Sequence, residues 1–595
     1  MNKFEYKNLT PFKWFVLENF PFIEADLDAI TDWQLYCKLG KEINKIIDSQ
    51  NVVGSEMEKL TQAFIDLQNY VDNYFKNLDV QDEINNKLDE MAEDGTLAEI
   101  FANYLNLTRF IDTTTNLINE TSTTKIKNGY IIETFGYNEI GDGGNTKILI
   151  TDVIPQNKFY FTLQNNLYGI PLTNKENVLI YGIKNDGVTD NTTLLNQLIN
   201  YTNKLYFPAG TYLLNELNID NKSNFELYGD GYDSILKCNN PNTKTFFYFI
   251  KMSNGENYKC HNLKLDSLYI GLNMTFNFIN VSNSTIENCF ITGSTGQRTV
   301  NIQNYDTKYG YNNNIKNNYV LKDSVSCISG ALIECTGEIK DGEPQFLHNT
   351  KIVNNTCICK CSVYTGDIDL FDCIETDNCY DTLINDNYCE TTMHHGISLD
   401  TRNIRTICSN NHVVSKSTIS GSKNGIEITG TYGAELMEGI VSNNIIDGFD
   451  SNGISVDAKN YSIIGNRINN SNRGIILTDL CTTGNMICEN ICTNIKEFGI
   501  YVSGSVSKAR ILNNNARIYV GEGPGSQIYI VSPMTVNNDL TNGMLRIEYI
   551  NGLFNTDYTQ GIQTNGLALN MLSDGRLVVY NRHTNTWQSI TTTNI

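Results

Sequence analysis

Two neighbouring segments of the chain carry an unusual density of carboxylate side chains. They are residues 366–378, GDIDLFDCIETDN, and residues 394–405, HHGISLDTRNIR. A glycosidase needs two carboxylates that face one sugar bond, about 5 Å apart for retention of configuration and roughly 6.5 to 9.5 Å apart for inversion. Clustered carboxylates also repel, which raises the pKa of one of them and can make it a general acid near neutral pH. The two segments therefore indicate a site for hydrolysis of a glycosidic bond.

The residue types in and after these two segments indicate which side chains would be catalytic and which would bind substrate. The predicted catalytic carboxylates are Glu375, Asp377, Asp400 and Asp457. The predicted substrate-binding residues are Asp372, His395, Arg402 and Glu427.

Three alternatives stay open from the residues alone. The acidic side chains could be ordinary solvated corners of the fold. His394 and His395 flank a turn, where either could simply bond backbone groups. A polysaccharide lyase would need a base beside charge-neutralising groups, and Arg402 with Arg405 could serve. A chain that only binds sugars would need no close carboxylate pair at all.

These segments belong to a repeat. Between Gly396 and Ile500 the pair Gly-Ile returns five times, at 396–397, 425–426, 453–454, 474–475 and 499–500, and steps of 29, 28, 21 and 25 residues separate successive isoleucines. Constant strands with variable, Asn-rich corners are typical of a parallel β-helix, because Asn tolerates the left-handed backbone of a tight bend. In such a stack an outward residue lies about 4.8 Å from its counterpart in the next coil.

That spacing predicts which carboxylates become neighbours. Alignment of GALIE, GISLD, GIEIT, GISVD, GIILT and GIYVS predicts one outward column: Glu334, Asp400, Thr429, Asp457, Thr478 and Ser503. In the coil between the first two members, either Glu375 or Thr376 falls in this column. Glu375 and Asp400 would then be one strand spacing apart, and Asp400 and Asp457 two, so both glycosidase geometries stay available.

The segment that precedes the coils has a recognisable pattern. It reads Tyr181, Gly182, Asp186, Gly187, Thr189, Asp190, and then Tyr206, Phe207, Pro208, Gly210, Tyr212. Its expected order is strand, Gly-Asp loop, a helix capped by Thr189 or Asp190, strand and turn. The segment resembles the opening of the pectate-lyase-like superfamily of right-handed β-helix proteins, over roughly residues 177–515. The resemblance implies that Asp186 and Asp190 are loop and cap residues, and the helix is expected to cover the open end of the stack.

The N-terminal part differs in kind from the coils. Residues 43–74 follow a heptad pattern, which predicts a coiled coil or an amphipathic helix packed on its own domain. A second helix is expected over 80–105, and strands from 109. The Gly-rich turn at 141–144 lacks a following GK[ST] and is interpreted as a hairpin or bulge. The predicted domains are 1–108 helical, 109–172 small β, 173–515 β-helix and 516–595 a short β region with a turn at Asp574-Gly575.

Taken together, the helical start, the stretch TFGYNEIGDGGNTK and the β-helix resemble tail spikes or neck appendages of phages. The resemblance implies N-terminal helices docked to phage neck or tail proteins and a homotrimeric β-helix that binds or degrades a bacterial surface glycan or teichoic acid. It also implies that the C-terminal β region, 516–595, drives trimer assembly or binds the receptor. A pure adhesin or a structural fibre would share this architecture. The implied location is the virion, with synthesis in the host cytoplasm, and the start of the chain shows no signal-peptide pattern.

The amino-acid composition argues against two classes of binding partner. Lys+Arg 44 against Asp+Glu 66 gives a net charge of −22, which argues against nucleic acid and against an anionic membrane. The chain has no apolar stretch long enough to span a bilayer.

Cys357, Cys359 and Cys361 alternate as on a strand and are expected to be stacked, buried thiols. Paired CxxC motifs are absent, so neither a metal nor a cofactor is predicted.

Overall fold

A computed structural model describes the central part of the chain and short stretches near both ends. The described residues are 62, 65–66, 81–94, 96, 109–123, 125–239, 248–267, 274–293, 298–323, 326–327, 330–361, 363–364, 371–417, 423–429, 437–478, 484–503, 506, 508–520, 527–531, 567–571, 577–581 and 586–589. The chain divides into two units, residues 1–182 and 183–595. The predicted division at 172/173 therefore lies ten residues before this one.

In the first unit, α5 (Gln81–Glu93) confirms the start of the second predicted helix. Most of the predicted heptad over 43–74 lies outside the described residues. A small sheet follows, in the order β1 (Arg109–Ile111), β2 (Ile131–Thr134), β3 (Thr146–Thr151), β5 (Tyr168–Pro171) and β4 (Phe161–Thr162). The helix α7 (Thr114–Asn119) adds Leu117 to its buried core.

The Gly-rich segment 141–144 joins the antiparallel strands β2 and β3, as a hairpin interpretation requires. The carboxylate of Asp142 accepts hydrogen bonds from the backbone N–H groups of Tyr137, Asn138, Glu139 and Gly144. These bonds hold the pKa of Asp142 below its ordinary value although burial opposes them. The segment is therefore a self-contained turn.

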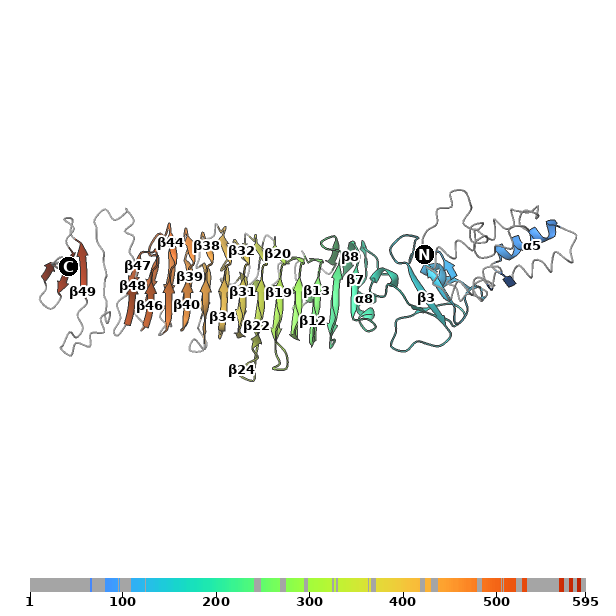
Figure 1. Cartoon of the computed structure of the whole chain (residues 1–595), viewed down its shortest axis with the longest axis horizontal. Helices are drawn as coiled ribbons and strands as arrows, with labels where there is room; N and C mark the ends of the chain where they lie inside the picture. The colour runs from blue at the N-terminus through green and yellow to red at the C-terminus, as the bar shows by residue number, and fades with distance from the viewer. Residues whose placement is uncertain are drawn as a thin grey trace. The chain divides into compact units, whose positions relative to one another are not determined.

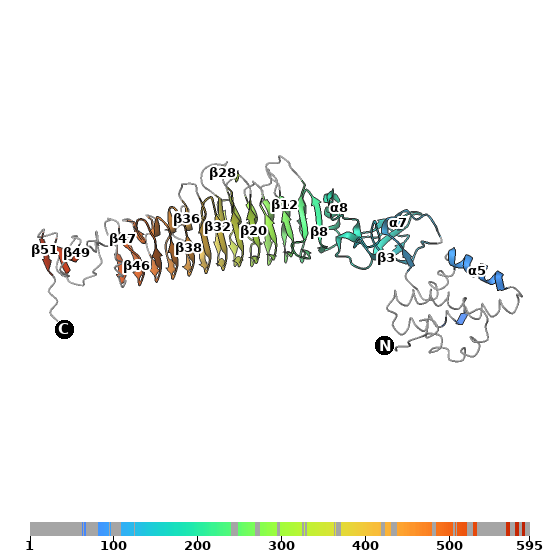
Figure 2. The same cartoon turned by 90° about the horizontal axis from the view of Figure 1, so that it is seen from above.

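The second unit contains a right-handed parallel β-helix, which confirms the predicted fold class (Figures 1 and 2). Each coil contributes one strand to each of three parallel sheets. Among the described residues, sheet 1 runs from β7 (Lys204–Phe207) to β48 (Gln527–Val531), and sheet 2 from β6 (Asp186–Asp190) to β44 (Ile491–Thr493). The chain leaves one strand, passes through the other two sheets and returns beside that strand, a crossover whose right hand is strongly favoured.

Sheet 3 has twelve described strands and carries the carboxylate segments. Its strands are β9 (Leu217–Asp220), β12 (Tyr248–Glu256), β15 (Met274–Ser282), β18 (Arg298–Asn304), β22 (Gly330–Gly337), β29 (Phe371–Asp377), β33 (Ile397–Leu399), β36 (Asn424–Thr429), β39 (Asn452–Asp457), β42 (Arg473–Leu477), β45 (Ile500–Val502) and β47 (Ile518–Val520). About a dozen coils, as predicted, are thus present. The stack continues beyond the predicted limit at residue 515.

The Gly-Ile repeat sets the register of this sheet over its last coils. Ile397, Ile426, Ile454, Ile475 and Ile500 pair in one inward column, as the alignment of the repeats predicts. All five are fully buried. The predicted thiol stack is also confirmed, since Cys357, Cys359 and Cys361 are fully buried and Cys357 pairs with Cys389.

A buried ladder of asparagines links the coils at the corner between sheets 1 and 2. Its members, each no more than 2% exposed, are Asn318, Asn355, Asn387, Asn411, Asn444, Asn466, Asn490 and Asn514. In Asn444, for example, Nδ2 donates to the carbonyl of Cys408 and to Oδ1 of Asn466, and the backbone N–H also donates to Asn466 Oδ1. The residue before it, Asn443, has φ 56°, which confirms the left-handed corner.

The opening of the stack differs in part from the prediction. The expected loop at 186–190 is β6, which pairs with β8 (Gly210–Leu214) across a register shift. The helix α8 (Thr192–Leu198) has Asn191 as its N-cap, whereas Asp190 accepts a hydrogen bond from the N–H of Thr192. Asp186 accepts hydrogen bonds from the N–H groups of Val188 and Thr189, so both aspartates stabilise the local backbone. The helix α8 lies at the end of the stack, beside β7 and β8 (Figure 1).

Near the C-terminus, β49 (Leu567–Met571), β50 (Leu577–Asn581) and β51 (Thr586–Ser589) form an antiparallel sheet. Tyr580 pairs with Trp587 in its backbone register. The predicted turn at Asp574-Gly575 lies outside the described residues. No helix among the residues searched is both long and apolar enough to cross a bilayer.

The asparagine ladder yields a stability prediction. Replacement of Asn444 by Ala removes the side-chain bonds to Cys408 and Asn466 and also removes the Oδ1 to which the backbone N–H and Nδ2 of Asn411 donate. Because these groups are buried, we expect the free energy of unfolding to fall by about 2 to 4 kcal/mol, measured by urea denaturation. Asn314→Ala is the matched control, since that side chain bonds only the carbonyl of Asn312 at the surface. Equal effects of the two substitutions would contradict a special role for the ladder.

Candidate functional site

The outward face of sheet 3 carries two parallel columns of polar side chains. In column 1, Glu334 pairs with Glu375, Glu375 with Ser398, and Ser398 with Glu427. In column 2, two residues further along each strand, Thr336 pairs with Asp377 and Thr429 with Asp457. Thr376 pairs with Leu399, so Asp377 and Asp400 come next, side by side, in column 2.

This register corrects the predicted column. The part from Asp400 through Thr429 and Asp457 is confirmed. Glu334 is not a member, because GALIE is offset by two residues and Glu334 lies level with Ser398. The neighbour of Asp400 is therefore Asp377, and neither Glu375 nor Thr376 occupies that place. The error arose because β22 and β29 are longer than the Gly-Ile strands: the first glycine of β22 is no guide to register, and β29 has no glycine at all.

The predicted carboxylates thus fall into two groups: four that lie close together, and Asp457, which lies one strand further along the sheet. Glu375, Asp377, Asp400 and Glu427 lie on three consecutive strands, β29, β33 and β36, or directly after them. Neighbouring residues of a column lie on strands about 4.8 Å apart, and those two strands apart are separated by about twice that. Asp457 is separated from Asp400 by Thr429, and Glu427 is separated from Glu375 by Ser398.

One cation enters the carboxylate cluster from β18. The guanidinium Nε of Arg298 forms an ion pair with Glu334 Oε2, and Glu334 is only 2% exposed. Burial lowers the pKa of Arg298, but the charge of Glu334 outweighs burial and raises it, so the guanidinium stays protonated. Glu334 also accepts a hydrogen bond from the hydroxyl of Thr336. Glu334 is therefore a structural anchor rather than a free carboxylate.

At the corner before β33, two histidines hold the buried carboxylate of Asp372. His394 Nδ1 lies 2.8 Å from Asp372 Oδ1, and the backbone N–H of His395 donates to the same oxygen at 3.0 Å. The two imidazole rings are 3.4 Å apart between centroids. Burial raises the pKa of Asp372 to about 7, although His395 opposes that rise.

The tautomer of His395 follows from its bonds. Its Nδ1 accepts the backbone N–H of Asn424 at 2.9 Å, so the proton sits on Nε2, which contacts Glu427 Oε2. Burial raises the pKa of Glu427, but the hydrogen bond from His395 outweighs burial and holds that pKa below its ordinary value. Glu427 is therefore an oriented, ionised acceptor in column 1.

The central carboxylates have raised pKa values. Burial, and then the charge of Asp400, raise the pKa of Asp377 to about 7. Burial, and then Asp372, raise the pKa of Asp400 to about 6, although the Ser398 hydroxyl donates to its Oδ1 at 2.8 Å. Burial, followed by repulsion from Glu334 and Asp372, raises the pKa of Glu375 well above its usual range. The cluster can thus hold protonated and ionised carboxyls together near neutral pH.

The two arginines considered for a lyase differ in position. Arg405 pairs with Asp381 at 2.6 Å and stacks on the ring of Tyr380, on the side of sheet 1. Arg402 lies in the turn after β33 with φ 54°, and its Nη1 is buried without a hydrogen-bond partner. Among the described residues, neither arginine forms a hydrogen bond or an ion pair with Asp377 or Asp400.

Sequence reasoning missed two members of the site, Arg298 and Asn424. Arg298 meets Glu334 only because β18 and β22 pair, and Asn424 acts through its backbone N–H. No local pattern marks either role.

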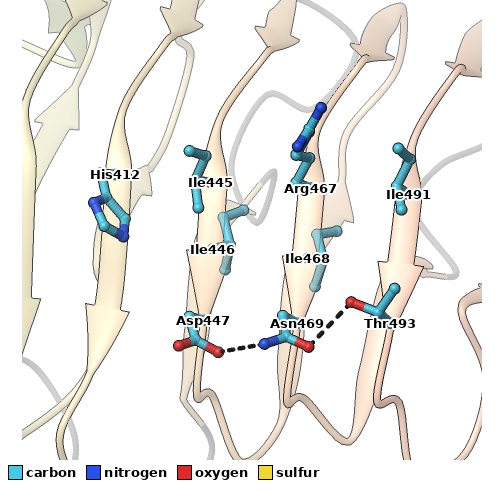
Figure 3. Close-up of a pocket in the computed structure, with 9 residues that line it drawn as sticks. All are labelled: His412, Ile445, Ile446, Asp447, Arg467, Ile468, Asn469, Ile491 and Thr493. Atoms are coloured by element: carbon cyan, nitrogen blue, oxygen red, sulfur yellow. Dashed lines mark hydrogen bonds between the residues drawn. The ribbon is translucent and has the colours of Figure 1, made fainter.

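A hollow of about 320 Å³ lies apart from this cluster, on the outer face of sheet 2 (Figure 3). It is lined by His412, Ile445, Arg467, Asp447, Asn469 and residues beside them. Among the described residues, no group of three or more His, Cys, Asp and Glu side chains could hold a metal ion.

Two protein-family models match the chain, each over less than half of its length. The model "Rhamnogalacturonase A/epimerase, pectate lyase-like" matches residues 176–383, which confirms the predicted resemblance over that segment. The model "Periplasmic copper-binding protein (NosD)" matches residues 347–519. The described residues of that segment do not fit a copper site, because no cluster of three or more His, Cys, Asp and Glu side chains forms among them. No curated protein sequence matches the chain.

Several solved structures are similar. The Dettilon tailspike protein (gp208) is 17% identical over 57% of this chain and 67% of its own, with a TM-score of 0.43. The enzymatically active domain of tailspike protein 2 from bacteriophage CBA120 is 13% identical over 69% of this chain and 56% of its own, with a TM-score of 0.41. The tailspike protein gp49 from Acinetobacter baumannii bacteriophage Fri1, a capsular polysaccharide depolymerase, is 12% identical over 71% and 75%, with a TM-score of 0.39.

The raised pKa of Asp377 predicts a pH-dependent stability. Between its ordinary value of 3.8 and its folded value of about 7, the folded state binds more protons than the unfolded state. The contribution of Asp377 is therefore complete below the lower value and is lost as the pH rises through this window. Asp377→Asn should increase the free energy of unfolding at about pH 8 and change it little at about pH 4, measured by urea denaturation.

Asp233→Asn is the control for this measurement. Asp233 is exposed in the turn between β10 (Glu226–Gly229) and β11 (Ser234–Cys238). An equal response of both variants at high pH would mean that general charge, not the cluster, is responsible.

Proposed function

We propose that the chain is a spike-like appendage of a phage particle that binds a bacterial surface glycan and hydrolyses it. The adjacency of Asp377 and Asp400 on the outer face of sheet 3 carries this proposal. Their expected spacing of about 4.8 Å suits a retaining glycosidase, whose two carboxyl groups are about 5 to 5.5 Å apart. The pectate-lyase-like match over 176–383 supports a carbohydrate substrate.

In this mechanism Asp377 is the general acid and Asp400 the nucleophile. The carboxylate of Asp400 attacks the anomeric carbon while the bond to the leaving oxygen breaks, and Asp377 gives its proton to that oxygen. Asp377 then takes a proton from water, which attacks the anomeric carbon and releases Asp400. The pKa of Asp377, about 7, suits the acid, and the pKa of Asp400, about 6, suits the group that must be ionised.

The remaining carboxylates and histidines serve binding in this proposal. Glu427, oriented by His395, and the half-buried Glu375 accept hydrogen bonds from sugar hydroxyls along column 1. Asp372 positions both histidines through its Oδ1. Arg402, at the turn beyond Asp400, offers a guanidinium to the same chain of sugars.

The sequence resemblance to phage tail spikes supports a location in the virion and a bacterial surface target. The protein would act as a homotrimer in the virion, attached through its N-terminal helices to neck or tail proteins, after synthesis in the host cytoplasm. Its target would be a surface polysaccharide or teichoic acid met during host adsorption. Neither nucleic acid nor membrane is a partner in this proposal.

Substitution of either catalytic carboxylate tests the mechanism. Asp400→Asn and Asp377→Asn should each lower kcat on host-wall glycan by about 10² to 10⁴-fold, because each removes a nucleophile or an acid while its shape is kept. Glycan affinity should stay within a few-fold. Release of new reducing ends measures cleavage, and proton NMR of the first product measures its anomeric configuration.

The control is Asp457→Asn, whose neighbour Thr429 is not acidic. It should retain activity, with retention of configuration in the product. Loss of activity in this variant, together with an inverted product from the wild type, would assign catalysis to Asp400 and Asp457 instead. Unsaturated uronates would identify a lyase, and binding without new chain ends would identify an adhesin.

A further inference from the structure

The hollow of about 320 Å³ on the outer face of sheet 2 takes no part in the proposed catalysis. It crosses four consecutive strands, β35 (His412–Ser415), β38 (Ile445–Asp447), β41 (Arg467–Asn469) and β44. Its two walls stand two residues apart on each strand, about 7 Å, and three strand spacings give it a length of about 14 Å. The hollow is therefore a short trench along the stack, of a size that suits part of an extended ligand.

The first wall of the hollow is apolar on either side of one cation. Ile445 and Ile491 lie in this row with Arg467 between them (Figure 3). Ile445 is 48% exposed. Within the described part of the chain, Arg467 has no carboxylate partner, although the chain has 66 acidic residues. In a protein with a net charge of −22, such an exposed cation is a local attraction for an anionic group.

The second wall of the hollow is a rigid row of hydrogen-bonding groups. Asn469 donates to Asp447 Oδ1 at 3.2 Å and accepts from the hydroxyl of Thr493 at 3.0 Å (Figure 3). Asn470 donates to the same oxygen of Asp447 at 2.8 Å. Among the described residues, these bonds hold the row in place and leave Asp447 Oδ2 and a lone pair of the Thr493 oxygen as acceptors for a ligand.

A sugar ring satisfies both walls at once. Its C–H groups lie against Ile445 and Ile491, and its hydroxyls donate across the trench to Asp447 and Thr493. An apolar protein side chain would fit the first wall, but it would cover the carboxylate of Asp447 without a hydrogen bond, which costs free energy. Arg467 adds a strong, charge-assisted partner for a carboxylate or a phosphate on the sugar.

We infer that the hollow is a second, non-catalytic binding site for the surface glycan and takes a sugar unit that carries an anionic group. The inference rests on the proposed function for the identity of the polymer. Sheets 2 and 3 are faces of the same stack, so a polymer held at the hollow stays near the carboxylates of sheet 3 at a raised effective concentration. The hollow thus retains the glycan between cleavage events.

Calorimetric titration of the full chain with short fragments of host-wall glycan tests the inference. The background is Asp400→Asn, in which the fragments stay intact. We expect two fragments per chain in this background and one after the further change Arg467→Gln/Asp447→Asn, whose two substitutions cancel in net charge. Affinity at the hollow should fall by about 10- to 100-fold, because hydrogen bonds to charged groups are lost.

Reduction of the carboxyl groups of the glycan to alcohols separates the two kinds of anion. Loss of the second site with reduced fragments identifies a carboxylate, and its retention identifies a phosphate, which this treatment leaves intact. Arg467→Gln alone should weaken the second site. Unchanged affinity in that variant would overturn the assignment of an anionic ligand.

The matched control is Lys237→Gln/Asp233→Asn, the same exchange of charges at β11 of sheet 2, outside the hollow. It should keep two fragments per chain, and circular dichroism should show that every variant is folded. Two fragments per chain in the folded hollow variant, or one fragment that persists in it, would overturn the inference.

Failure of the hollow and failure of the proposed hydrolysis are distinguishable. One fragment per chain that disappears in the hollow variant would confirm the hollow and count against the site on sheet 3. With Asp400 intact, Arg467→Gln/Asp447→Asn should keep kcat on short fragments and raise KM on the whole polymer. An unchanged KM on the polymer would contradict a role of the hollow in retaining the glycan.

Discussion

Backbone pairing between successive coils in a fixed register is the constraint on which every other feature of this protein depends. The buried asparagines hold it, because each amide bonds the next asparagine and a backbone carbonyl of the preceding coil, as Asn444 does with Asn466 and Cys408. A slip of one residue would turn inward side chains outward and leave these amides unpaired in the interior. The ladder therefore fixes both the spacing of the coils and the face to which each residue belongs.

The same stacking produces two surfaces of opposite character. On sheet 3 it sets Asp377 beside Asp400 and Glu334 beside Glu375, which costs electrostatic free energy because like charges repel. Arg298 and His395 offset part of that cost at the edges of the cluster, through Glu334 and Glu427. At the corner of sheets 1 and 2, stacking aligns Leu383, Ile407 and Ile440 in one outward apolar column.

The electrostatics of the carboxylate face and the rigidity of the corner are thus linked. The pKa values of Asp377 and Asp400 are raised first by burial and then by neighbouring charges, and the fixed coils maintain both. The inward column of isoleucines through Ile426 and Ile454, together with the amide ladder, supplies the rigidity. A looser scaffold would hydrate and separate the carboxylates and lower their pKa values toward the ordinary range.

The β-helix, its inward isoleucine column, the buried thiols and the column of Asp400, Thr429 and Asp457 could be predicted from the residues alone, because they follow from a local period in which strand length is constant. The position of the acidic segments on the outer face could be predicted in the same way. Strand pairing in the folded chain was needed to show that Asp377, not Glu375, accompanies Asp400, and that Arg298 and Asn424 join the site. Neighbours across coils depend on the length of the corners and on strands that start before or after the Gly-Ile pair, and no local pattern encodes either.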